Sequence, residues 1–116
     1  MKSLTCDKII DSNGWLSGWY DYRDGDLMAI VNQPEKFEKV TEVNDLQELY
    51  RLLRNFDGAF KYRNLLFFRD WQYGTFVYDI NKPESYIEHL SIDAISLDRF
   101  KEIINDLVIQ NDEKAC

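Results

Sequence analysis

The chain has little of what small enzymes use for catalysis. Among its 116 residues it holds one histidine, His89, and two cysteines, Cys6 and Cys116. It contains no glycine-rich phosphate loop, no G-x-S-x-G nucleophile motif and no H-E-x-x-H zinc motif. The cysteines lie near opposite ends and form no C-x-x-C pair, so their spacing predicts neither a metal site nor a redox pair. We therefore expect no enzyme activity, no cofactor and no metal.

Long apolar segments are also missing. No apolar run approaches the roughly 20 residues that a membrane span requires. The first residues, Met1 to Asp7, hold no apolar stretch of the length found in signal peptides. These absences predict a cytoplasmic protein without membrane association, in which both thiols stay reduced.

Basic residues are fewer than acidic ones. There are 21 Asp and Glu against 14 Lys and Arg, which gives a formal net charge of -7. An acidic surface repels nucleic-acid backbones, so we expect no direct nucleic-acid binding and a protein partner with a basic surface. The alternative is that the charge only keeps a small protein soluble. Five basic side chains gather in the middle of the chain, where we expect them to neutralise nearby carboxylates: Arg51, Arg54, Lys61, Arg63 and Arg69. The alternative is that they contact an acidic partner or a nucleic acid.

Proline and glycine are scarce, with two and five residues, and they stand at predicted turns. The length predicts one domain over residues 1–116. Asp24-Gly25 is a strong hairpin signal between strands expected at about 15–22 and 27–32. A short extended segment is expected within residues 37–43.

Two amphipathic patterns predict helices. One spans about 45–57, with Asn44 as N-cap, a stripe from Leu46 to Phe56 facing the core, and Gly58 just beyond the C-terminal end. The other spans about 97–110, with Ser96 as N-cap. A strand over 59–69, a return strand over 75–80 and a strand over 86–92 complete the pattern. We expect an α+β fold, with an antiparallel sheet of about four to six strands built from hairpins and both helices packed mainly on one face.

Large aromatic side chains are abundant, at 15% of the residues. Trp and Tyr are enriched in protein interfaces, and a turn is an unusual place for them unless they are packed or bound. Trp71 and Tyr73 occupy such a turn, so we interpret them as partner-binding anchors. Asp21, Asp24 and Asp26 are candidate phosphate-mimicking charges for the same partner. The alternative is that the aromatic rings cover the face of the sheet that lacks helices.

His89 is the one candidate for proton transfer near neutral pH. It stands next to Glu88 in a predicted strand, where neighbouring side chains point to opposite faces, so the two cannot form a dyad. An enzyme hypothesis would need His89 to line a pocket together with another carboxylate. Without an accompanying motif, the pattern favours a structural or surface histidine.

Small size, acidity and missing catalytic motifs together are typical of stoichiometric inhibitors. In broad type, and without a shared sequence signature, the chain resembles anti-CRISPR and phage counter-defence proteins. It is similar in the same way to immunity proteins that neutralise bacterial nuclease toxins. The leading hypothesis is an inhibitor that blocks a basic nucleic-acid-processing enzyme. A self-associating accessory domain is the alternative from another class, so either a monomer or a homodimer is compatible with the sequence.

Overall fold

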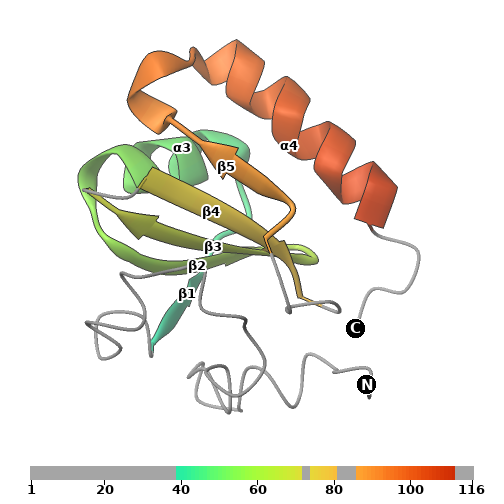
Figure 1. Cartoon of the computed structure of the whole chain (residues 1–116), viewed down its shortest axis with the longest axis horizontal. Coiled ribbons are helices and arrows are strands. Elements are labelled where there is room, and N and C mark those ends of the chain that lie inside the picture. The colour runs from blue at the N-terminus through green and yellow to red at the C-terminus, as the bar shows by residue number, and fades with distance from the viewer. Residues whose placement is uncertain (1–38, 72–73, 81–85, 112–116) are drawn as a thin grey trace.

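The computed structural model describes residues 39–71, 74–80 and 86–111, and the strands expected at 15–22 and 27–32 lie outside these ranges. Within them the chain forms five strands, two α-helices and one 3-10 turn (Figure 1). In chain order these are β1 (Val40–Glu42), α3 (Leu46–Asn55), β2 (Gly58–Tyr62), β3 (Leu65–Asp70), β4 (Gly74–Asp79), β5 (Glu88–Leu90), η3 (Ile92–Ala94) and α4 (Leu97–Asn111).

The five strands form one sheet in the order β1-β2-β3-β4-β5. The pairs β2–β3, β3–β4 and β4–β5 are antiparallel, whereas β1 pairs with β2 in parallel. A parallel pair needs a crossover rather than a tight turn, and α3 supplies it between β1 and β2. The two outer strands, β1 and β5, are each three residues long. The predicted α+β class, with a largely antiparallel sheet, is confirmed.

Both helices pack on the same face of the sheet (Figure 1), as expected. Alternation along β3 and β4 sends Phe67 and Val77 into that layer. There they share a core with Leu53 of α3 and with Phe100 and Ile104 of α4, all almost fully buried. On the opposite face of the sheet Phe68 and Tyr78 are also buried. The central strand β3 is therefore covered on both faces, as its continuous apolar run Leu65–Phe68 predicts.

The single strand expected over 59–69 is wrong. Residues 63 and 64 form a turn, and Tyr62 pairs with Leu65 across it. Arg63 adopts a left-handed φ of 54°, which bulky residues rarely take and which reverses the chain here. The sequence carries no Asn-Gly or Asp-Gly pair at this turn, so the usual hairpin signal is absent.

The boundaries of α3 also differ from the prediction. The N-cap is Asp45 rather than Asn44, because the Asp45 carboxylate accepts the Glu48 backbone N–H at 3.0 Å. The helix ends when Phe56 turns extended, with φ -138° and ψ 138°. Gly58 then opens β2 instead of capping the helix.

The second helix begins as predicted. The Ser96 hydroxyl accepts the Arg99 backbone N–H at 3.1 Å, which satisfies one of the free donors of the first turn. The strand expected over 86–92 is shorter, because Ile92 already starts the 3-10 turn that leads into α4. None of the helices in the described ranges is long and apolar enough to cross a membrane.

Candidate functional site

One end of the sheet brings together Trp71 and His89, two residues that the sequence singled out. At this end Gly58 of β2 pairs with Arg69 of β3, and Asp70 of β3 pairs with Gly74 of β4. We call it the Trp71 end, because Trp71 follows directly on β3. The last turn of α3 reaches the same end through the Leu53 carbonyl oxygen, which Arg69 binds, and the connection from β5 to η3 lines the hollow there.

Trp71 is 74% exposed, although the residue before it, Asp70, is 4% exposed. The change from buried strand to exposed indole occurs within one residue. β3 pairs with β2 up to Arg69 and with β4 up to Asp70, so the backbone that leads into Trp71 is anchored by the sheet. An exposed indole directly after a paired strand makes Trp71 a candidate interface anchor.

A shallow depression of about 490 Å³ lies beside Trp71. Its lining includes Asp70, His89, Ser91 and Asp93, which come from β3, β5 and the start of η3. His89 therefore does line a hollow that contains carboxylates, which is the arrangement the enzyme hypothesis requires.

The imidazole of His89 has a packing role in this hollow. Its ring stacks on Phe76, with centroids 4.3 Å apart and planes 11° from parallel. It also lies over Gly74, where an added Cβ would come within 2.7 Å of His89 Nε2. The strand register places Glu88 opposite Val77 and His89 opposite Phe76, so the two side chains point to opposite faces as predicted. His89 thus packs against Phe76 and Gly74 of β4.

Arg69 ties α3 to the sheet beneath Trp71. Its Nε donates to the Leu53 carbonyl oxygen at 2.7 Å, and its guanidinium meets the Asp57 carboxylate at 2.7 Å. The side chains of Arg69 and Asp57 are 13% and 21% exposed. Because this ion pair is largely shielded from water, separating it would leave each charge with an uncompensated desolvation penalty. The geometry of the pair is therefore fixed.

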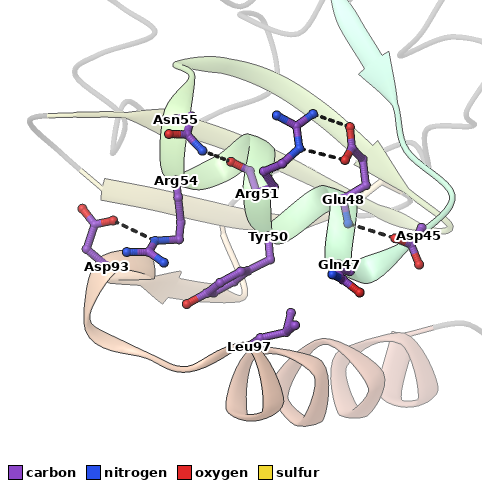
Figure 2. A pocket seen from close by; sticks show the side chains of 9 residues that line it. All are labelled: Asp45, Gln47, Glu48, Tyr50, Arg51, Arg54, Asn55, Asp93 and Leu97. Carbon is purple, nitrogen blue, oxygen red and sulfur yellow. Dashed lines mark hydrogen bonds and ion pairs between the residues drawn. The ribbon is translucent and has the colours of Figure 1, made fainter.

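A second groove, of about 670 Å³, runs between α3 and the segment from η3 into α4 (Figure 2). Figure 2 shows two opposite-sign pairs in it, Arg51 with Glu48 and Arg54 with Asp93, and the Asp45 carboxylate bonded to the Glu48 backbone N–H. The hydrogen bond from Arg51 holds the pKa of Glu48 below its ordinary value and raises the pKa of Arg51. The Tyr50 hydroxyl donates to the Ile95 carbonyl oxygen at 2.6 Å, which closes the floor of the groove.

The basic side chains of the middle segment are neutralised largely as predicted. Ion pairs join Arg51 to Glu48, Arg54 to Asp93, Lys61 to Glu42 and Arg69 to Asp57. Arg63 instead places its guanidinium 5.7 Å from the centre of the Tyr62 ring. Four of these five cations are thus engaged by carboxylates.

The structure places one of the five predicted partner-binding residues, Trp71, at this end. Tyr73, Asp21, Asp24 and Asp26 lie outside the described residues. Sequence reasoning missed Phe56, which was expected to face the core in the helical stripe. It is 54% exposed, because the helix ends at Asn55 and the extended backbone turns the ring away from the stripe. Asp57-Gly58 directly after it was the available signal of an early helix end.

Within the described ranges no three His, Cys, Asp or Glu side chains come close enough to hold a metal ion. Comparison with known proteins found no family, no curated protein and no solved structure that matches this chain. Function is therefore inferred from the residues of the Trp71 end.

Proposed function

We propose that this protein is a stoichiometric inhibitor that binds a basic nucleic-acid-processing enzyme and blocks its functional surface. The observation that supports the proposal is the exposed indole of Trp71, fixed at the end of a buried strand. A tryptophan left 74% exposed offers a large apolar area for a partner to cover, and Trp is enriched in protein interfaces. Aromatic anchors on rigid backbone bind at low entropic cost, because little conformational freedom is lost on docking.

The net charge supports the choice of partner. A protein of net charge -7 is drawn toward basic surfaces, which raises its rate of association with them. Nucleic-acid enzymes present such surfaces to bind phosphates. The acidic residues Asp21, Asp24 and Asp26 would replace those phosphates on the enzyme. The same chemistry suits either a phage counter-defence inhibitor or an immunity protein for a nuclease toxin.

The test is affinity capture from a lysate of the organism that encodes the chain. Wild-type, Trp71→Ala and Asp24→Lys baits are compared at low and at high salt, and the captured proteins are quantified by mass spectrometry. We expect wild type to retain one basic nucleic-acid enzyme that high salt releases. Trp71→Ala should reduce its capture by about tenfold or more, the usual effect of losing a central aromatic anchor. Asp24→Lys should weaken capture most at low salt.

Ile109→Ala serves as the matched control. Ile109 is 75% exposed, as much as Trp71, but it lies near the C-terminal end of α4. Its loss should leave capture unchanged. Equal capture by wild type and by Trp71→Ala would remove the basis of the proposal. Recovery of the bait alone, with a dimer in sedimentation, would point to the self-associating domain instead.

A further inference from the structure

Phe56 and Trp71 leave the sheet at the same end. Gly58 pairs with Arg69 in the β2–β3 register, and each aromatic residue stands two positions outside that pair. Phe56 precedes β2 and Trp71 follows β3, so the antiparallel arrangement brings both to the Trp71 end. They are two of the four large hydrophobic side chains that are exposed among the described residues.

The backbone beneath the two rings is braced from both sides. Arg69 donates to the Leu53 carbonyl oxygen in the last turn of α3 and pairs with Asp57, the residue next to Phe56. The Phe56 backbone N–H donates to the Leu52 carbonyl oxygen at 2.9 Å. On the other side, Asp70 is buried and paired with Gly74. Arg69 thus links the segment of Phe56 to the strand of Trp71.

The charges around the two rings indicate what would cover them. The Asp57 carboxylate is already bound by Arg69, so it adds no free charge. Asp93, on the far side of the hollow beside Trp71, has a side chain that is 72% exposed and a single-point contact of 3.4 Å with Arg54. Exposed pairs of this kind contribute little to stability, so the contact with Arg54 does little to hold Asp93 back from another cation. A partner cation can therefore reach Asp93 while the rings bury apolar surface.

We infer that Phe56 and Trp71 form a paired aromatic anchor that enters an apolar site flanked by Lys or Arg on a protein partner. The inference rests on the proposed function and adds a second anchor and a contact chemistry to it. Because hydrogen bonds hold the backbone that carries the two rings, the rings lose little conformational freedom on binding. Each ring also displaces water from the partner. Lys or Arg at the rim of the partner site would meet Asp93, which favours basic partners over neutral ones.

Site-specific photo-crosslinking tests the inference before the partner has been identified. The full chain is made with the photo-reactive analogue benzoyl-phenylalanine at position 56, 71 or 109, and each version is irradiated in lysate of the encoding organism. Positions 56 and 71 should give the same covalent adduct, with a partner peptide that contains apolar residues and Lys or Arg. Position 109, equally exposed on α4, should not give it. High salt should suppress the adduct.

The outcomes separate the two proposals. An adduct from position 71 but not from 56 would overturn the paired anchor and leave the proposed function standing. Adducts from neither position would overturn both. An adduct with nucleic acid, or with a partner surface that lacks Lys and Arg, would overturn the contact chemistry.

Affinity for the crosslinked partner, once purified, provides a second readout. Phe56→Ala and Trp71→Ala should each weaken binding by about tenfold or more, and Asp93→Asn by less. Phe56 is exposed and outside the helix, so Phe56→Ala should keep the wild-type circular dichroism spectrum. Unchanged affinity of Phe56→Ala would contradict the inference.

Discussion

Gly74 is restricted by its backbone and by a neighbouring ring. Its φ of 94° lies where side chains are strained, and a Cβ would come within 2.7 Å of His89 Nε2. We expect Gly74→Ala to lower the free energy of unfolding by about 1–3 kcal/mol. Urea unfolding followed by circular dichroism measures the change.

The double variant Gly74→Ala/His89→Ala separates the two causes. Removing the imidazole relieves the close approach but leaves the positive φ, so the double variant should recover part of the loss due to Gly74→Ala and not all of it. Wild-type stability in Gly74→Ala alone would show that neither restriction matters.

At the same scale, the sequence was informative where a residue type is unusual in its setting. Trp71 stands in a turn, and its exposure follows from that position. Phe56 fitted the apolar stripe of the predicted helix. Only the extended backbone after Asn55 shows that its side chain does not belong to that stripe. The left-handed φ of Arg63 could not be predicted from the residue type. Turns prefer glycine or asparagine at such positions only statistically, and the pairing of β2 with β3 overrides that preference here.

At the scale of elements, the ion pair of Arg69 connects the end of α3 to β3. Arg69→Met keeps the length of the side chain but leaves Asp57 and the Leu53 carbonyl oxygen without this donor. Breaking a sheltered pair from one side costs more than the pair itself contributes, so we expect a loss of about 2–3 kcal/mol in denaturant unfolding.

The Arg51–Glu48 pair on α3 is the matched control for that prediction. Both side chains are about half exposed, so Arg51→Met should change stability little. Since Arg51 lowers the pKa of Glu48, the small contribution of this pair exists above the ordinary Glu pKa and disappears as pH falls through the lowered value. If Arg51→Met proved as destabilising as Arg69→Met, burial would not be what distinguishes the two pairs.

Elements with a clear hydrophobic periodicity were predicted from the sequence. Features that depend on contacts with other parts of the chain were not. The spacing of Leu49 and Leu53 fixed the helical face of α3, and the continuous run in β3 indicated a strand covered on both sides. The shortness of β5 depends on where η3 begins, which no local pattern encodes. The hollow beside Trp71 depends on the register of three strands, which brings His89 over Gly74.

At the scale of the whole molecule, one core joins the described elements. It extends in sequence from Val43, just after β1, to Val108 in α4, with the sheet between. Since the helices and the sheet share this core, we expect a single cooperative unfolding transition. Far-UV circular dichroism and tryptophan fluorescence should give the same urea midpoint. In Trp71→Phe the remaining fluorescence comes from Trp15 and Trp19, and a separate midpoint there would contradict the prediction of one domain over 1–116.

The brevity of β1 and β5 has a consequence for the behaviour of the protein at high concentration. The outer strand of a sheet offers unpaired backbone groups on which another chain can add a strand and start a fibril. Here each outer strand of the described sheet is three residues long, and β1 carries the charged Glu42 while β5 carries Glu88. These edges are poor templates for strand addition, so we expect the described sheet to resist fibril formation at high concentration.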